Sequence, residues 1–515
     1  MGKYLCYDLK GIQHYIFQVP KLKCCIGGSR QIDGFDKTTT EEIARINGVK
    51  KIYAGGGKGA FECETEQSLD EAKKALIAKT HELGLTIRFG INDDYCKAAQ
   101  EINETYSYQP ESLKGQPCSM SGLYPTEKGI HPLIKSRIEL GGKHDSESEV
   151  EKALLKPIRD YFQNNALRFF YNVNANDRDS FDKNADANDA KEAAVALGNR
   201  NRWAVVCMDG NDMGMQFLEF KKKNRTDQEW KDWLKNMSLH LDEVTCNAAA
   251  AGMKKVAELY LAKPNHNDVL PLRPLIVGGD DVTVLVGCEY AFEFVREVIR
   301  SFNNQSKKFG ELWVGTQGEL TISAGILFAP VTLPLHSAIE YAELLLKSAK
   351  TKGRNLKKGK GNCIASPSCL DWESVTEGLL DNPGARRKRE LLFNDEEINK
   401  KVELTERPYS MEGFDKLEKQ AERFNNLPRV IQYQLHPSLY APLAKRLAFY
   451  AKIGKNYPEL KKYLQAPVPI SGLDHAKYGE GWTVENDRQT TGILDALLLL
   501  QEENRMDHPT INEEM

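Results

Sequence analysis

The predicted order of secondary structure repeats within this chain, and the repeat limits its fold more than any other feature. Each half is predicted to run β–α–β–turn–β–α–β, with a glycine-rich turn between the two central strands. The turns are GGGKG at residues 55–59 and GGDD at residues 278–281. The two halves share this order of elements but not their amino-acid sequences. An internal duplication of one ferredoxin-like unit accounts for the pattern.

The first copy is expected at residues 1–100 and the second at residues 201–365. In the first copy, Ser68 is a suitable N-cap for a helix that Gly84 would end. We predict strands there at 3–9, 51–54, 60–64 and 85–91, and helices at 11–23 and 68–84. In the second copy we predict strands at 203–208, 274–277, 282–286 and 320–329, and helices at 238–262, 289–309 and 336–352.

The remaining segments are predicted to form a linker or small inserted domain at 101–200 and a helical C-terminal domain at 366–515. The linker should contain a helix at about 149–170 and a loop at 172–190 that is rich in Asp and Asn. That loop lacks the glycine and the closing glutamate of a calcium loop, so a solvated loop is the preferred interpretation. The clearest C-terminal helices are predicted at 410–424, 437–453 and 489–503.

The composition favours a soluble protein of several domains. Of 515 residues, 41% are hydrophobic, and no apolar run approaches the ~18 residues of a membrane-spanning helix. No segment resembles a signal peptide. The 11 cysteines are scattered without a C-x-x-C motif, which favours reduced thiols and a cytoplasmic location. A net charge of −3 favours a small anionic substrate over a long duplex.

Three aspartates are candidates for a metal site. Asp209 ends a predicted buried strand, and Asp280 and Asp281 follow the glycines of the second turn. Phosphoryl transfer to a hydroxyl uses divalent cations, and Mg²⁺ or Mn²⁺ prefers oxygen ligands such as carboxylates. Strand alternation would place Asp280 and Asp281 on opposite faces unless the turn twists them together. One is then expected to bind the metal, with the other beside it or on the nucleotide.

Residues around these aspartates are candidates for binding the phosphates of a nucleotide. Gly278 and Gly279 would let a triphosphate approach the backbone closely. Gly210, Asn211 and Asp212 form a tight turn into a helix, and the free N–H groups of such a turn suit a phosphate.

Two lysines, Lys347 and Lys350, lie one turn apart on the helix predicted after the fourth strand. They would neutralise a triphosphate as point charges. Simpler explanations exist for each feature alone: GGDD can be an ordinary type I′ turn, Asp209 a helix cap, and the lysines a solvated face. The joint order favours the nucleotide site, because a palm fold requires these residues in this order.

Three segments resemble the catalytic palm of the large polymerase/cyclase subunit of type III CRISPR effector complexes. They are AVVCMDGNDMG at 204–214, LIVGGDDVTVLV at 275–286, and the stretch from LTISAGILFAP to the lysines at 320–350. Other segments resemble the first, degenerate palm of the same subunit, namely DLKGIQHYIF at 8–17, LKCCIGGSRQID at 22–33 and IYAGGGKGAF at 52–61.

The resemblance implies an α+β fold with two ferredoxin-like palm domains in tandem, the second catalytic, and a helical C-terminal domain. It implies a nucleotidyltransferase that converts nucleoside triphosphates, ATP foremost, to a cyclic di- or oligonucleotide second messenger in antiviral defence. Asp209, Asp280 and Asp281 would hold Mg²⁺ or Mn²⁺, with Lys347 and Lys350 near the triphosphate. RNA, protein complex subunits or a second copy of the chain would be its partners.

The sequence departs from the family in three respects. The family often begins with an HD nuclease domain, whereas here the only such pair, His144-Asp145, lies among loop-forming residues. Of the zinc-binding cysteines common between the palms, only Cys118 is present. The chain is also short for a complete effector subunit. The chain could therefore be a stand-alone relative that is activated by something other than target RNA.

The first copy is expected to supply a cradle for the second nucleotide. Gly56, Gly57 and Lys58 keep the glycines of the turn but replace its carboxylates, which makes a poor metal site and a suitable triphosphate cradle. Gly28 and Ser29 could add backbone N–H donors. The alternative is an ordinary glycine hairpin, and the acceptor nucleotide would then come from a second protomer, as in single-palm cyclases that dimerise.

Two other functions stay open on the sequence alone. One is a non-catalytic or RNA-dependent subunit of a CRISPR-type ribonucleoprotein, and the other is a polymerase or nucleotide sensor. The intact GGDD turn argues against a relict palm, and the lack of basic excess argues against a template channel. Base preference, 3′–5′ or 2′–5′ linkage, ring size, trigger and downstream effector do not follow from the sequence.

Overall fold

The computed structural model of the chain describes residues 2–19, 22–102, 116–117, 125–126, 131–141, 156–170, 202–221, 226–264, 266, 268–314, 316–358, 365–376, 381–395, 400–464, 482–485 and 488–504. The polar loop predicted at 172–190, Cys118 and the His144-Asp145 pair lie outside these residues.

The N-terminal domain is a four-stranded sheet with helices. Its strands β1 (Lys3–Lys10), β2 (Val49–Gly55), β3 (Lys58–Cys63) and β4 (Thr86–Asn92) lie in the order β2-β3-β1-β4. Its helices are α1 (Ile12–Phe17), α2 (Leu22–Gly34), the π-helical turn η1 (Phe35–Thr39), α3 (Thr40–Ile43), α4 (Glu66–Glu82) and α5 (Tyr95–Glu101). Thr65, rather than the predicted Ser68, caps α4, because the two residues form a capping box.

The second domain has the same strand order and extends it. Its strands β8 (Arg202–Gly210), β10 (Leu272–Gly278), β11 (Asp281–Val286), β12 (Ile322–Pro330), β13 (Cys369–Ser374) and β16 (Tyr409–Ser410) lie in the order β10-β11-β8-β12-β13-β16. Its helices are α10 (Met213–Lys221), α11 (Asp227–Leu261), α12 (Ala291–Ser306) and α13 (Leu335–Lys357), with 3-10 turns η4 (Cys288–Tyr290) and η5 (Lys307–Leu312). The boundary predicted at residue 365 falls just before two further strands of this sheet. A capping box of Thr226 and Glu229 starts α11 well before the predicted residue 238.

The two sheets agree in register as well as in strand order, which confirms the predicted duplication. Asp8 of β1 lies opposite Lys58 of β3, and Asp209 of β8 lies opposite Asp281 of β11. The outer strands β2 and β10 each carry a bulge at the same distance from the turn. Asp8 and Asp209 therefore occupy equivalent positions, and so do Lys58 and Asp281.

Strand β8 is buried on both faces, which explains its continuous apolar sequence. Ala204, Val206 and Met208 belong to a core that includes α11 and α12. The alternate residues, among them Val205 and Cys207, belong to a core that includes α13 and much of the N-terminal domain. The strand that carries Asp209 is thus fixed from both sides.

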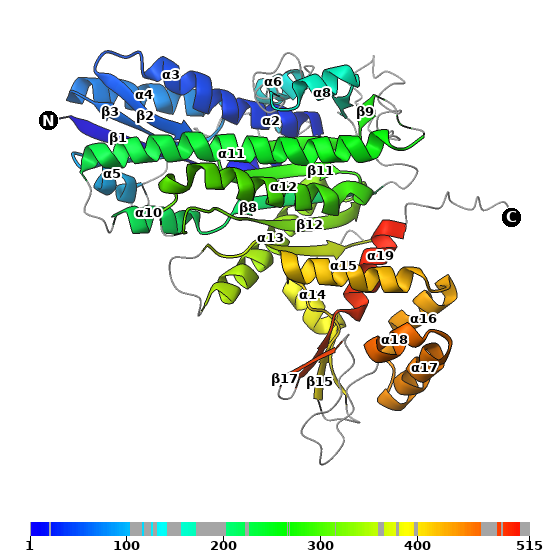
Figure 1. The fold of residues 1–515 in the computed structure, drawn as a ribbon. Coiled ribbons are helices and arrows are strands. Elements are labelled where there is room, and N and C mark those ends of the chain that lie inside the picture. The colour runs from blue at the N-terminus through cyan, green and yellow to red at the C-terminus, as the bar shows by residue number, and fades with distance from the viewer. Residues whose placement is uncertain are drawn as a thin grey trace.

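The two domains pack against each other along α11. Figure 1 shows α11 running between the blue N-terminal domain and the green second domain. This helix packs along α12 and also contacts β2 and β10, and α2 of the N-terminal domain contacts β10. The contacts bring the two glycine-rich turns to the same interface.

The described residues of the intervening segment form short elements, which are β5 (Gln116–Pro117), β6 (Pro125–Thr126), α6 (Pro132–Gly141), α8 (Arg159–Asn164) and β7 (Arg168–Phe169). Strand β7 pairs with β9 (Val269–Leu270), which precedes β10. Helix α6 packs against α2, where a Cβ at Gly27 would lie 1.9 Å from the Arg137 carbonyl oxygen. The glycine therefore allows the two helices to touch.

After β13 the chain is mainly helical, but it also contains a four-stranded sheet that was not predicted from the sequence. Its strands β14 (Leu392–Asp395), β15 (Lys400–Glu403), β17 (Trp482–Glu485) and β18 (Arg488–Thr491) lie in the order β14-β15-β18-β17. The helices are α14 (Pro383–Glu390), α15 (Met411–Asn425), α16 (Arg429–Leu439), α17 (Leu443–Asn456), α18 (Pro458–Leu464) and α19 (Ile493–Asn504). Buried Arg407 binds Glu373 of β13 at 3.2 Å and Asp495 of α19 at 2.9 Å, and so ties this region to the sheet of the second domain. Within the described parts of the chain, no helix combines the length and apolarity that crossing a bilayer requires.

Candidate functional site

Three carboxylates meet at the end of β8. Asp209 lies near the end of β8, Asp281 is the first residue of β11 directly opposite, and Asp280 occupies the turn between β10 and β11. One oxygen of each carboxylate lies within 4.8 Å of the others. The turn thus brings Asp280 and Asp281 to the same side as Asp209, which strict strand alternation would not do.

Glycines allow this close approach. Gly279 has a φ of +59°, a conformation that favours glycine, and it starts the two-residue turn. A Cβ at Gly210 would lie 3.0 Å from the Cβ of Asp280, and the Gly210 N–H donates to the Asp280 carbonyl at 3.1 Å. Gly210 therefore lets the turn pack against the end of β8.

Burial, together with repulsion between the carboxylates, raises the pKa of two aspartates of the cluster. Burial, and then the charges of Asp209 and Asp281, raise the pKa of Asp280 well above its usual value. Desolvation by the surrounding protein and the charge of Asp209 raise the pKa of Asp281 to about 6, against the opposing effects of Lys350 and Lys58. The Lys350 ammonium lies 2.6 Å from Asp209 Oδ1 and donates to the Gly210 carbonyl at 2.8 Å.

The donor set fits a hard divalent cation. The three aspartates offer only oxygen ligands, which Mg²⁺ and Mn²⁺ prefer. Burial first, and then mutual repulsion, raise the pKa values of Asp280 and Asp281, and a cation between the carboxylates would offset both effects. Asp209, Asp280 and Asp281 are the residues that would hold it.

The turn after Asp209 is held by contacts within the protein. Asn211 is buried, its side-chain N–H₂ donates to Thr321 Oγ1 at 2.9 Å, and its oxygen accepts from Ser323 at 3.0 Å. Asp212 has a φ of +58°, and its carboxylate binds Lys357 at 3.0 Å. These side chains fasten the end of β8 to β12 and α13, so their role as nucleotide ligands stays a prediction.

The helix α13 contributes two lysines to this end of the sheet, and one of them was not predicted. Lys350 reaches Asp209, whereas Lys347 is exposed one turn earlier. Lys357 reaches Asp212 from the last turn of the same helix. Its spacing of seven residues from Lys350 places it on the same helix face, and that spacing is the signal that could have identified it.

The N-terminal domain presents its turn toward this cluster. The positive charge of Lys58 acts on the Asp281 carboxyl across the domain interface. Gly56 and Gly57 form the two-residue turn, with φ values of +60° and +74°. In the equivalent of the carboxylate site, Asp8 is retained and forms an ion pair with Lys10. Asp8 is a residue that sequence patterns alone did not single out.

The prediction that Gly28 and Ser29 offer free backbone N–H groups is wrong. Both residues lie inside helix α2, where backbone N–H groups bond to carbonyls four residues earlier. Gly28 is buried, and a Cβ there would lie 3.3 Å from the Cα of Ile16. The small residue serves the packing of α2 on α1.

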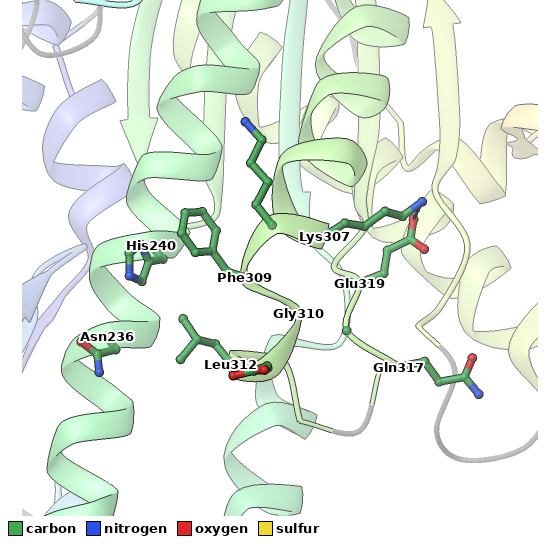
Figure 2. A pocket seen from close by; sticks show the side chains of 11 residues that line it. Asn236, His240, Lys307, Phe309, Gly310, Leu312, Gln317 and Glu319 are labelled. Carbon is green, nitrogen blue, oxygen red and sulfur yellow. Dashed lines mark ion pairs between the residues drawn. The ribbon is translucent and has the colours of Figure 1, made fainter.

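A cavity of about 990 Å³ lies apart from the carboxylates, between α11 and the segment around η5. Figure 2 shows Asn236 and His240 on the α11 side and Gln317 and Glu319 on the other. The ring of His240 stacks on Phe309 with 4.1 Å between centroids. None of the three aspartates lines this cavity, so it is not the carboxylate site.

Fold and site together define a protein with two tandem palm domains, of which the second carries the carboxylate cluster. Residues 202–357 match the family model of the Cas10/Cmr2 second palm domain. This stretch of the chain is therefore similar to the second palm of Cas10-like subunits. A search of curated proteins gave no match.

Solved structures agree with this assignment at the level of the fold. The chain is similar to Csm1 in the crystal structure of the Csm1–Csm4 cassette in complex with cA4, with a TM-score of 0.55 and 14% identity. That match covers 98% of this chain and 70% of the other. The apo Csm1–Csm4 cassette gives a TM-score of 0.50 at 13% identity, over 98% of this chain and 70% of that one.

Proposed function

We propose that this chain is a metal-dependent nucleotidyltransferase that joins nucleoside triphosphates, ATP foremost, into a cyclic di- or oligonucleotide signal. The observation that carries the proposal is the convergence of Asp209, Asp280 and Asp281 beside Lys350 at the end of β8. Such a cluster meets the main requirement of phosphoryl transfer, which is to stabilise charge on the transferring phosphoryl group.

In the second palm, the aspartates would bind the metal ion and the lysines would bind the phosphates of the nucleotide. Bound Mg²⁺ or Mn²⁺ would supply Lewis-acid stabilisation of the attacking and leaving oxygens. Asp209, Asp280 and Asp281 would hold it and orient it. Lys350, which pairs with Asp209 in this structure, would bind a phosphate oxygen, and Lys347 would extend the positive charge along α13.

The first palm would hold the second nucleotide. Joining two nucleotides needs a donor at the metal site and an acceptor whose hydroxyl faces it. Lys58 stands at the position equivalent to Asp281 and directs its charge toward the Asp281 carboxyl. A lysine there supplies fixed positive charge for a triphosphate without a metal ion. Gly56 is exposed beside it and would leave its backbone open to a phosphate, whereas Gly57 is buried and its N–H donates to Asp36.

The comparisons support a nucleotide as ligand and an effector complex as context. The structures similar to this chain include a Csm1–Csm4 cassette in complex with cA4. By analogy, this chain would act in antiviral defence as a subunit of a type III CRISPR effector complex, with a partner protein and RNA as its trigger. The fold similarity to a two-protein cassette also supports a second candidate function, in which the chain is an RNA-dependent or non-catalytic subunit.

The experiment that separates the two functions is product analysis. The purified chain is incubated with each labelled nucleoside triphosphate and Mg²⁺ or Mn²⁺, with and without the partner subunits and target RNA, and products are identified by mass. A cyclic oligonucleotide that disappears in the Asp280→Asn/Asp281→Asn variant would support the cyclase. If no nucleotide product forms in any combination, the chain is a non-catalytic subunit.

A further inference from the structure

The turn that carries Asp280 and Asp281 is held by two side chains of helix α11. The N–H of Gly279 donates to Asp242 Oδ1 at 3.1 Å, and the carbonyl oxygen of Gly279 accepts from Thr245 Oγ1 at 2.6 Å. Asp242 and Thr245 are three residues apart and therefore lie on one face of the helix. The two bonds engage both peptide groups that flank the Gly279 Cα.

Burial and close packing restrict how far the turn can move relative to α11. Thr245 is fully buried, so its hydroxyl would lose its partner if the turn moved away. A Cβ at Gly278 would lie 3.3 Å from Asp242 Oδ1, so this glycine allows the carboxylate to reach the turn. A two-residue turn has few other bonds that fix it, and the carboxylates of Asp280 and Asp281 move with it.

The same kind of contact occurs in the first palm. There the N–H of Gly57 donates to Asp36 Oδ2 at 2.8 Å, and Asp36 lies in η1, directly after α2. An aspartate from the connection between the first and second strands of each palm thus accepts an N–H of the glycine turn. The two bonds differ by one position, because Gly56 is equivalent to Gly279 and Gly57 to Asp280. The first palm therefore offers a similar contact rather than the same one.

Asp242 also faces the first palm. The pair formed by Lys37 and Asp33, at 2.8 Å, lies close enough for the Asp242 charge to raise the pKa of both groups. Removing the charge of Asp242 would therefore change the domain interface as well as the turn. Thr245, which is uncharged, allows the turn to be tested separately.

We infer that Asp242 and Thr245 are positioning residues that fix the Gly278–Asp281 turn and thereby set the spacing of the three carboxylates. The inference rests on the proposed function in that the carboxylates are taken to bind a divalent cation. Neither side chain is required to touch nucleotide or metal. Their effect on the reaction passes through Gly279.

The test compares substitutions that keep or remove each hydrogen bond. Asp242→Asn and Thr245→Ser keep the acceptor and the donor, whereas Asp242→Ala and Thr245→Val remove them. Mn²⁺ affinity is measured by electron paramagnetic resonance with a non-hydrolysable ATP analogue present, and turnover is measured on the same samples. Glu243→Ala, an exposed carboxylate next to Asp242, is the matched control for lost charge. Thermal melting shows that each variant is folded.

Loss of either bond is expected to weaken Mn²⁺ binding about tenfold, as a missing hydrogen bond in a partly buried site typically does. Thr245→Ser and Asp242→Asn should stay within about threefold of wild type, well below the loss in the truncated variants. Wild-type Mn²⁺ affinity in both Asp242→Ala and Thr245→Val would overturn the inference. Equal losses in Thr245→Ser and Thr245→Val would also overturn it, because the hydroxyl would then be irrelevant. If wild type binds Mn²⁺ but makes no product, the proposed function fails while the positioning role is still judged by Mn²⁺ affinity.

Discussion

The ammonium of Lys58 in the first palm favours the charged form of the Asp281 carboxyl in the second palm. The two residues occupy equivalent positions in the duplicated sheets. The interface therefore sets the positive charge of Lys58 against a carboxylate that we propose to bind a metal ion. A donor at the carboxylates and an acceptor at the lysine would then face each other, with no second protomer required.

The first prediction concerns this pair. Lys58→Glu should block product formation, because it places a negative charge where the acceptor triphosphate would bind. Binding of a non-hydrolysable triphosphate, measured by calorimetry, should fall from two sites to one. Lys50→Glu, an exposed lysine on the same hairpin, is the control. Wild-type product formation by Lys58→Glu would mean that the first palm is structural and that the acceptor comes from another protomer.

The second prediction concerns the carboxylates. Asp209→Asn, and the double variant Asp280→Asn/Asp281→Asn, should each reduce turnover on the order of a hundredfold or more, because each removes a metal-binding oxygen charge. The melting temperature of the double variant should not fall, since burial first, and then the charges of neighbouring carboxylates, raise the pKa values of Asp280 and Asp281 and so disfavour their charged forms. Turnover is measured at saturating Mg²⁺. Full activity in both variants would contradict the proposed mechanism of the second palm.

The sequence predicted the parts of this site that depend on local pattern. Apolar periodicity and glycine placement predict the order of elements along the chain, the position of Asp209 at the end of a strand, and the turn at residues 278–281. The strand order within each sheet agrees with the predicted ferredoxin-like unit. Lys350 could be predicted as a candidate from the sequence because it lies on a helix that follows a clear strand.

Features that depend on contacts between distant residues were missed. Asn211 turns toward Thr321, and Asp242 reaches Gly279, across separations that no periodicity records. Gly28 was expected to offer a backbone N–H to a phosphate, but it lies inside α2 and packs against α1. The strands after residue 365 are short, so their pairing depends on the sheet that β12 offers.

The third prediction concerns the α13 lysines. Lys350→Ala should raise the KM for nucleoside triphosphate more than it lowers kcat, if the ammonium mainly holds the triphosphate. Because Lys350 competes with a metal ion for the Asp209 carboxylate, its removal should also lower the Mg²⁺ concentration needed for half-maximal rate. Lys347→Ala, one turn away and exposed, should have the smaller effect. An unchanged KM in both variants would identify these lysines as a solvated face.

The fourth prediction concerns Asp212, which fastens the turn after Asp209. Burial opposes its charge, but Lys357 and Ser366 more than offset this and lower the pKa of Asp212. A depressed folded-state pKa contributes stability above the unfolded value of ~3.9, and that stability is lost as pH falls through the folded pKa. Asp212→Asn should therefore cost about 2 kcal/mol at pH 7 and less in acid. Chemical denaturation at pH 7 and below pH ~4 measures both values. A cost that does not shrink in acid would contradict the ion-pair account.

The last prediction concerns Asp36, which holds the turn of the first palm. Burial is the main cause that raises the pKa of Asp36 to about 7, against the Gly57 N–H, Lys37 and Lys51, which lower it. The unfolded carboxyl titrates near ~3.9, so the folded state holds this proton more tightly. This contribution to stability is fully present below ~3.9 and is lost as pH rises to about 7.

Asp36→Asn cannot ionise but keeps an oxygen that can accept the Gly57 N–H. Relative to wild type, the variant should therefore gain thermal stability as pH rises from 5 toward 8, with the difference levelling off once Asp36 is fully charged. Melting temperatures of both proteins across this range measure the difference. Asp70→Asn, a surface aspartate on α4, is the control and should show no such trend. A constant difference between Asp36→Asn and wild type would mean that the buried carboxyl does not titrate in this range.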